Sequence, residues 1–293
     1  MATTDPTAFT VIIPAHNEEA VIARCLNVLL ADVPADSKMQ VIIAANGCSD
    51  DTVAIARKVA PGAVVLDLPV GSKTAAMNAA NREALYFPRI YLDADVQCSY
   101  DSLQAVAQVL REPGIMTAAP ALRMDLSRSN WLARAYYRVW LTQPYVKRAL
   151  VGSGCFGLSK AAYERIGDFP PITGDDIWVY SRFSETERRN IANDAEGRPV
   201  WFLVSPPRRA IDQIRVETRR RLGNEQVLRD YPSPHYAGSN NAGDLYDALH
   251  EGASVLDVLI YLAIKAVVRL RVRRVKRKRK DIVWERDLAA REV

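Results

Sequence analysis

The chain has 293 residues, of which 49% are hydrophobic and 25% are charged, and its formal net charge is +5. These proportions are ordinary for a folded globular protein, and they exclude a disordered chain, a collagen-like repeat and a disulfide-stapled miniprotein. The length suits either one large domain or two small ones, and both can bury a sizeable core. We favour one large domain that is followed by a tail.

The positive charge is concentrated in the tail. Residues 269–280 carry nine Lys and Arg and no acid. Because these nine charges exceed the net charge of the whole chain, the remaining residues are net acidic. A nucleic-acid-binding groove across the body of the protein is therefore not expected.

Cysteine usage and the N-terminus predict a reducing compartment. Cys25, Cys48, Cys98 and Cys155 form no CxxC pair, which argues against a zinc ribbon and against a disulfide framework. Residues 1–7 lack the basic stretch and the apolar run of a secretory signal. We predict a cytoplasmic location, with peripheral attachment to the inner face of the cell membrane as a further hypothesis.

Short apolar runs alternate with segments of helical length in the first part of the chain. The runs predict strands at residues 9–13, 40–44, 63–66, 89–92 and 114–118, and the segments between them predict helices at 18–30, 51–59, 73–85 and 102–110. Strands that are apolar throughout are typical of a parallel sheet buried on both faces. The predicted fold is α/β, with an open, mostly parallel twisted sheet and helices on both faces.

The alternation becomes irregular after about residue 125. We predict helices at 131–141, 175–183 and 211–229, a strand at 200–204, and a glycine-rich loop at 152–157 that leads into another strand. Residues 231–243 are rich in Pro, Gly, Ser and Asn and are predicted to form a surface loop.

Two carboxylates follow the fourth predicted strand. Asp93 and Asp95 are two residues apart, so in an extended chain both project the same way from the edge of the sheet where ligands bind. Like charges this close repel each other unless a cation lies between them, and Mg²⁺ or Mn²⁺ with oxygen ligands suits such a pair. A solvated turn with two acids is the alternative.

Polar, turn-forming residues also follow the earlier strands. The first strand ends in Pro14-Ala-His-Asn17-Glu18, the second in Asn46-Gly-Cys-Ser-Asp50, and the third is followed by Lys73-Thr-Ala-Ala-Met-Asn78. The carboxyl ends of parallel strands meet at one edge of the sheet. Together with Asp93 and Asp95, these residues predict one binding site there.

This combination resembles glycosyltransferase family 2, whose members use nucleotide sugars and have the GT-A fold. The matching motifs are PxxNE at Pro14, Asn17 and Glu18, the turn at Asn46, Gly47 and Asp50, the helix start at Lys73 and Asn78, and DxD at Asp93 and Asp95. The resemblance continues in the loop at 152–156, in Asp175-Asp176 and in Arg219-Arg220-Arg221, and it covers residues 9 to about 229. It implies an inverting glycosyltransferase of the hexosyltransferase type.

The resemblance also implies roles for these residues. Pro14, Asn17, Glu18, Asn46, Asp50, Lys73, Asn78 and Asp93 would bind the donor, with His16 beside them, and Asp93 and Asp95 would hold Mg²⁺ or Mn²⁺. Arg219, Arg220 and Arg221 would face the leaving diphosphate. Asp175-Asp176 matches the Glu-Asp motif that supplies the general base, and by register we assign the base to Asp176. Ala45 stands where the family usually has an acid that contacts the nucleobase, so the nucleobase stays open.

Two other functions stay open at this point. A sugar nucleotidyltransferase on a related sheet would attack at phosphorus, although such enzymes usually carry a glycine-rich basic loop after the first strand, where this chain has PAHNEE. A non-catalytic scaffold with the same fold could use its basic tail to bind membrane or nucleic acid.

The predicted domain organisation separates a catalytic unit from the tail. Residues 1–230 form the catalytic domain, with a donor half at 9–120 and an acceptor half at 121–230, residues 231–253 a linker, and residues 254–293 an apolar helix and polybasic tail. Twelve of the fourteen residues at 255–268 are apolar, but a bilayer span needs about 20. The helix therefore either packs on the domain or lies on an anionic bilayer. The second alternative would suit a lipid-linked or polysaccharide acceptor at the membrane surface.

Overall fold

The computed structural model describes residues 7–147, 152–236 and 242–278. Nine strands among these residues join in the order β3-β2-β1-β4-β7-β6-β9-β5, with β8 paired to β6. The strands are β1 Phe9–Ala15, β2 Met39–Asn46, β3 Val64–Leu68, β4 Arg89–Leu92, β5 Val96–Cys98, β6 Thr117–Met124, β7 Cys155–Leu158, β8 Arg188–Ile191 and β9 Trp201–Val204. The helices are α1 Ile22–Leu30, α2 Thr52–Val59, α3 Lys73–Glu83, α4 Tyr100–Val109, α5 Trp131–Trp140, α6 Pro144–Lys147, α7 Lys160–Ile166, α8 Asp175–Arg182, α9 Ala210–Asp230, α10 Ala242–His250 and α11 Val255–Lys278, with a short 3₁₀ turn, η1 Glu185–Glu187.

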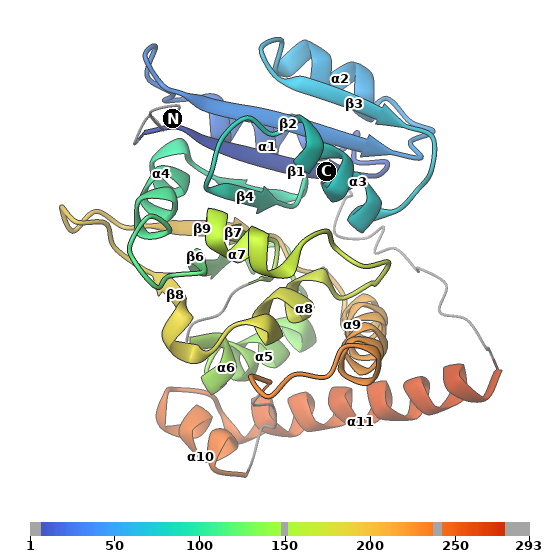
Figure 1. The fold of residues 1–293 in the computed structure, drawn as a ribbon. Coiled ribbons are helices and arrows are strands. Elements are labelled where there is room, and N and C mark those ends of the chain that lie inside the picture. Colours follow the sequence, from blue (N-terminus) through green and yellow to red (C-terminus); the bar gives the residue numbers. More distant parts are fainter. Residues whose placement is uncertain (1–6, 148–151, 237–241, 279–293) are drawn as a thin grey trace.

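Strands β3, β2, β1 and β4 are parallel, as the sequence predicts (Figure 1). Alternate residues of β1 point to opposite faces, because side chains in a strand alternate with period two. Val11 and Ile13 belong to a first apolar cluster, which includes residues of α1, α2 and α4. Ile12 belongs to a second apolar cluster, which includes residues of α3, α7 and α8. Every residue of β1 is buried, so the apolar character of the whole strand follows from burial on both faces.

The sheet is mixed beyond β4. Strand β7 lies antiparallel between β4 and β6, while β6 is parallel to β8 and β9. The strand predicted at 114–118 is wrong at its start, since β6 begins only at Thr117. Gly114 has a φ of 84°, and this left-handed conformation turns the chain after α4 before the strand can begin.

A third apolar cluster joins α5, α9, α10 and α11. Tyr261 of α11 stacks on Tyr136 of α5, with ring centroids 5.2 Å apart. The Arg138 guanidinium donates to both carboxylate oxygens of Asp257, at 3.0 and 2.6 Å. Helix α11 is therefore packed on the domain along one side, as one of the two predicted alternatives requires.

The linker predicted at 231–253 is wrong in its second part, because α10 occupies most of it. Leu245 and Ala248 lie three residues apart on one side of α10 and pack into the third cluster. This contact with α5 and α11 stabilises a helix that local turn-forming residues do not reveal.

No helix in the described ranges is both long and apolar enough to cross a bilayer. The basic residues at 279–280 and the rest of the predicted tail to residue 293 lie outside the described residues.

Candidate active site

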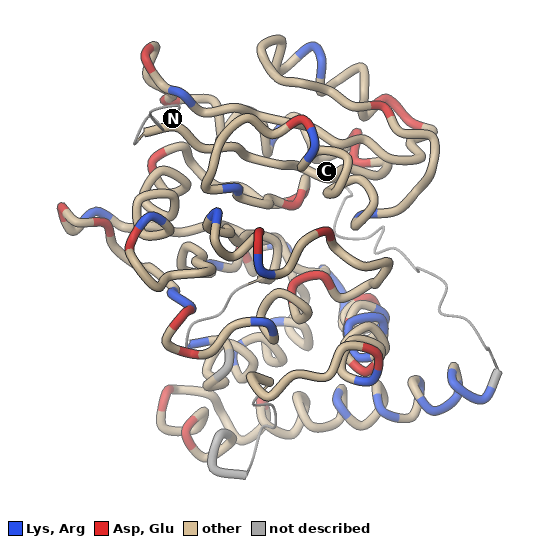
Figure 2. The backbone as a smooth tube through the Cα atoms, viewed as in Figure 1, with Lys and Arg blue, Asp and Glu red and all other residues tan. Residues whose placement is uncertain are grey.

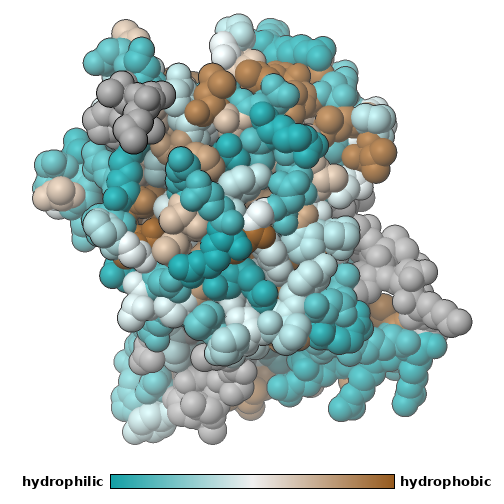
Figure 3. All heavy atoms as spheres, in the orientation of Figure 1, coloured by the Kyte–Doolittle hydropathy of each residue, from teal (hydrophilic) through white to brown (hydrophobic). Residues whose placement is uncertain are grey.

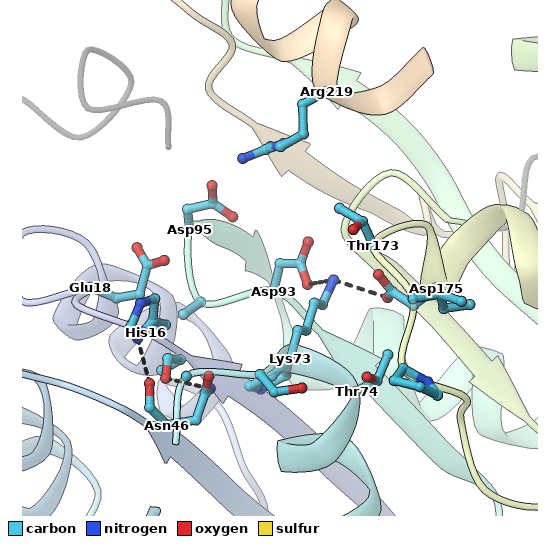
Figure 4. A pocket seen from close by; sticks show the side chains of 17 residues that line it. His16, Glu18, Asn46, Lys73, Thr74, Asp93, Asp95, Thr173, Asp175 and Arg219 are labelled. Atoms are coloured by element: carbon cyan, nitrogen blue, oxygen red, sulfur yellow. Dashed lines mark hydrogen bonds and ion pairs between the residues drawn. The ribbon is translucent and has the colours of Figure 1, made fainter. Parts of the chain in front are cut away.

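A cavity of about 350 Å³ opens at the carboxyl ends of β1, β2 and β4 (Figure 4). It is closed on its other sides by the start of α3, by the segment before α8 and by one residue of α9. Its lining residues are Pro14, Ala15, His16, Glu18, Asn46, Gly71, Ser72, Lys73, Thr74, Asp93, Ala94, Asp95, Pro171, Ile172, Thr173, Asp175 and Arg219. The position agrees with the rule that open α/β sheets bind ligands at this edge.

Lys73 lies between two carboxylates at the centre of the cavity. Its Nζ is 2.7 Å from Asp93 Oδ1 and 3.0 Å from Asp175 Oδ2 (Figure 4). Burial alone would lower the pKa of Lys73, but the two carboxylates outweigh burial and hold the pKa above its usual range. Lys73 is therefore a fixed positive charge in the cavity at neutral pH.

Asp175 is a carboxylate in an unfavourable environment. Its side chain is only 7% exposed, and burial raises its pKa to about 6 against the opposing attraction of Lys73. The nearby carboxylates of Asp176 and Asp93 contribute to this rise, since like charges disfavour the ionised form. The ion pair with Lys73 is what keeps Asp175 charged at neutral pH.

Asp93 and Asp95 stand together at the end of β4, as predicted. Their carboxylates face the same opening as Glu18, and the Arg219 side chain enters this opening from α9 with its guanidinium directed toward Asp95 (Figure 4). The turn that carries them is fixed by the Asp93 amide, which donates to the Gly154 carbonyl at 2.8 Å, and by the Val96 amide, which donates to the Asp93 carbonyl at 3.0 Å.

The cavity wall beneath Glu18 comes from the first two strand ends. Asn46 Nδ2 donates to the carbonyls of Ala15 and Ala44, at 2.8 and 3.2 Å, and His16 Nδ1 hydrogen-bonds the Asn46 carbonyl. Gly47 has a φ of 58°, and a Cβ there would lie 2.6 Å from the Gly71 amide nitrogen. Only glycine allows the turn after β2 to approach the segment before α3 this closely.

Asn17 and Asp50, predicted to bind the donor, instead tie the first two loops to each other. Asn17 Oδ1 accepts from the Ser49 amide at 2.7 Å. Asp50 accepts from the Thr52 hydroxyl at 2.6 Å and from the Glu19 amide at 3.2 Å. Neither residue lines the cavity, because these bonds direct both side chains between the loops.

Asn78 was also predicted to bind the donor, and it instead supports the cavity wall formed by the segment before α8. Its amide makes two bonds to the backbone of Phe169, at 2.8 and 2.9 Å. This pair holds the segment before α8, so that Pro171, Ile172 and Thr173 line the cavity. Pro171 and Ile172 were not predicted from the sequence as lining residues, and their place directly before Thr173-Gly174-Asp175 is the signal that could have indicated them.

The structure separates the two neighbouring acids of α8. Asp175 lines the cavity and Asp176 does not. Asp176 accepts from the Ile177 amide at 2.7 Å and more weakly from the Ser153 amide at 3.5 Å. Gly152 leaves room for it, since a Cβ there would lie 2.7 Å from the Asp176 Cβ. Asp176 is thus placed beside the glycine-rich loop.

The three arginines of α9 are separated in the same way. Arg219 reaches the cavity (Figure 4). Arg220 pairs with buried Glu217 at 2.6 Å, and Arg221 pairs with Glu225 at 3.2 Å. Successive residues of a helix are about 100° apart, so the prediction that all three face the diphosphate fits the cavity lining only for Arg219.

The comparisons with known proteins match this architecture. The family model described as "Glycosyl transferase family 2" matches residues 10–166. The chain belongs to this family. It is a glycosyltransferase, and the recognition made from its motifs is confirmed. No curated protein matches the chain by sequence.

Two similar solved structures support the fold. The mannosyltransferase PcManGT from Pyrobaculum calidifontis, in complex with GDP-Man and Mn²⁺, is 19% identical with a TM-score of 0.60, and the match covers 92% of this chain and 85% of that one. Glucosyl-3-phosphoglycerate synthase from Mycobacterium tuberculosis, in complex with Mn²⁺, UDP and glucosyl-3-phosphoglycerate, is 19% identical with a TM-score of 0.51, covering 78% and 81%. At this identity the likeness establishes the fold alone, and it confirms the GT-A class.

Proposed function

We propose that this glycosyltransferase moves a sugar from a nucleoside-diphosphate sugar to an acceptor hydroxyl with inversion of the anomeric carbon. The observation that carries the proposal is the arrangement of Asp93, Asp95, Lys73 and Arg219 around one polar cavity. Two acids suited to a metal and two cations suited to phosphate face the same space, as the departure of a diphosphate requires.

The cavity residues fit a divalent metal that is shared with the donor. In the described ranges no group of three or more His, Cys, Asp or Glu is arranged to hold a metal, so Asp93 and Asp95 would act as a pair. Mg²⁺ is commonly bound by one or two carboxylates together with substrate phosphates. When bound, Mg²⁺ or Mn²⁺ supplies positive charge that stabilises the leaving diphosphate, and the two similar structures contain Mn²⁺.

The chain's own cations serve the same leaving group. As the bond from the anomeric carbon to the phosphate oxygen breaks, its electron pair stays on the phosphate. Lys73, held in place by two carboxylates, and Arg219, which enters the opening from α9, are positioned to bind that developing charge. A cation that is already oriented stabilises a transition state without reorganising.

Asp176 is the proposed general base. The Asp175 carboxylate is engaged by the Lys73 ammonium at 3.0 Å, so an acceptor hydroxyl would have to compete with this ion pair for the carboxylate. Asp176 receives only backbone amides as hydrogen-bond donors in the described part of the chain. As the acceptor oxygen attacks the anomeric carbon, its proton would pass to Asp176, while Asp175 positions Lys73.

The donor and the acceptor are narrower proposals. Similar structures are complexes with GDP-Man in one case and with UDP-Glc and phosphoglyceric acid in another, which supports a GDP- or UDP-hexose donor. Ala45 is fully buried and offers the nucleobase no charge, so the donor screen must include both guanine and uracil nucleotides. For the acceptor we propose a lipid-linked or polysaccharide hydroxyl at a membrane surface, supported by the basic end of α11.

A donor screen tests this function. The protein is incubated with UDP-, GDP- and dTDP-sugars and Mn²⁺, and release of the nucleoside diphosphate is measured. Release is expected to disappear in Asp93→Ala and to persist in Asp36→Ala, a matched change of an exposed acid in the loop before β2. Pyrophosphate as the product would indicate a nucleotidyltransferase, and no turnover with any donor and acceptor would favour the scaffold.

A further inference from the structure

Helix α11 has two opposite sides with different surroundings. Asp257, Tyr261, Ile264, Val268 and Val272 follow one another at spacings of three or four residues and are buried against α5 and α9. Because such spacings keep side chains on one side of a helix, these five residues form the inward side of α11, which packs on the domain.

The outward side carries large apolar residues in its first turns. Val255, Leu259, Leu262 and Leu270 also follow a spacing of three or four, with Ala266 between the last two, and the four larger side chains are 43 to 66% exposed. Leu256 and Val267 flank them and are 58% and 45% exposed. A continuous apolar strip of this length is uncommon on a surface that meets only water.

The same outward side becomes basic toward its end. Arg273 and Arg277 continue the spacing after Leu270 and are exposed, and Arg269 and Arg274 flank the strip. The only acid of α11 is Asp257, which is buried and paired with Arg138. Figure 2 shows the basic residues gathered in the C-terminal half of α11, and Figure 3 shows hydrophilic side chains extending away from the body there.

We propose that this outward side of α11, from Val255 to Arg277, docks on an anionic lipid bilayer. A bilayer offers acyl chains to the leucines and negatively charged headgroups to the arginines, side by side along one plane. A second copy of the chain fits less well. Two antiparallel α11 helices would place the arginines of one over the leucines of the other, and two parallel ones would bring the basic ends together.

Ion pairs hold α11 in a fixed orientation. Lys265 pairs with Glu217 of α9 at 3.0 Å, and Lys276 pairs with Glu225 of the same helix. These contacts keep the inward side on the domain, so the leucines are presented without unfolding the helix. Helix α9 also carries Arg219 into the cavity, which would place the site about 20 Å from the headgroups, the thickness of two helices. The docking surface does not depend on the proposed reaction.

Vesicle co-sedimentation of the full chain tests the surface. One set of vesicles is phosphatidylcholine and the other an equimolar mixture with phosphatidylglycerol. The wild-type protein should bind the mixed vesicles and dissociate from them at high salt. Arg273→Glu with Arg277→Glu should weaken binding at least about 25-fold, since each basic residue near an anionic surface contributes about a fivefold change. Arg57→Glu with Lys58→Glu, two exposed residues of α2, should leave binding unchanged.

The leucines provide the decisive variant. Leu259→Gln with Leu262→Gln should weaken vesicle binding at least tenfold while leaving the thermal unfolding midpoint unchanged, because both side chains face away from the domain. The proposal is overturned if the wild-type protein does not bind mixed vesicles, or if the leucine substitutions leave vesicle binding unchanged. It is also overturned if sedimentation shows a dimer that these substitutions dissociate, since a second copy would then cover the face.

Discussion

The neighbouring acids of α8 give the sharpest test of the proposed site. Asparagine replaces aspartate with almost no change of shape, so Asp176→Asn and Asp175→Asn each remove one charge. The structure gives the two acids different partners, a pair of backbone amides for Asp176 and Lys73 for Asp175. The two variants are therefore expected to fail in different ways.

Asp176→Asn should lower kcat by about 10²- to 10⁴-fold, the usual contribution of a general base, which corresponds to about 3 to 5 kcal/mol. Donor affinity should stay within about twofold of wild type, because Asp176 does not line the cavity. Asp175→Asn should instead weaken donor binding by about 1.5 to 3 kcal/mol, the worth of a charged hydrogen bond, since Lys73 loses the 3.0 Å contact that orients it.

The pH dependence distinguishes the two acids further. Burial raises the pKa of Asp175 to about 6, so the carboxylate that pairs with Lys73 is lost as the pH falls through about 6. Wild-type donor affinity should therefore decrease below that pH, and Asp175→Asn should abolish the decrease.

Calorimetric titration with UDP or GDP in the presence of Mn²⁺ measures the affinity, and single-turnover release measures the chemical step. If Asp176→Asn keeps kcat within tenfold of wild type while Asp175→Asn loses it, Asp175 is the base and the assignment by register is wrong.

Three further outcomes follow from other contacts. Asp95→Asn should weaken metal-dependent binding of the diphosphate by several kcal/mol. In titrations of the wild-type protein, a chelator should weaken diphosphate binding by the same amount. Arg219→Ala should reduce diphosphate affinity at least about tenfold, whereas Arg221→Ala, whose arginine pairs with Glu225, should change it less than twofold; equal effects would contradict the cavity lining. Asp257→Asn should destabilise the fold by about 1.5 to 3 kcal/mol at pH 7 in denaturant titrations. Hydrogen bonds from Arg138 lower the pKa of Asp257 to about 2, so this stabilisation is present above about pH 4 and should fade as the pH falls toward 2; a difference that persists unchanged at pH 3 would refute the pair.

The local sequence determines the sheet and the edge that carries the site. Runs that are apolar throughout require burial on both faces, and β1, β2 and β4 form where they occur. Asp93, Lys73 and Asn46 were found because each follows a strand end, and such ends meet at one edge of a parallel sheet. The start of β6 at Thr117 and helix α10 were missed, because a left-handed glycine and a contact with distant helices decided them.

Tertiary structure alone decided which member of each polar cluster faces the cavity. Asp175 differs from Asp176, and Arg219 from Arg220, by one position in the sequence, yet about 100° of helix rotation gives them different neighbours. Asn17, Asp50 and Asn78 are directed to loop backbones by partners 31 to 91 residues away. Tertiary structure also decided which side of α11 is exposed, because the composition of this helix suits either a buried or a membrane-bound helix. Packing on α5 and α9 fixed its inward side and thereby determined which leucines remain exposed.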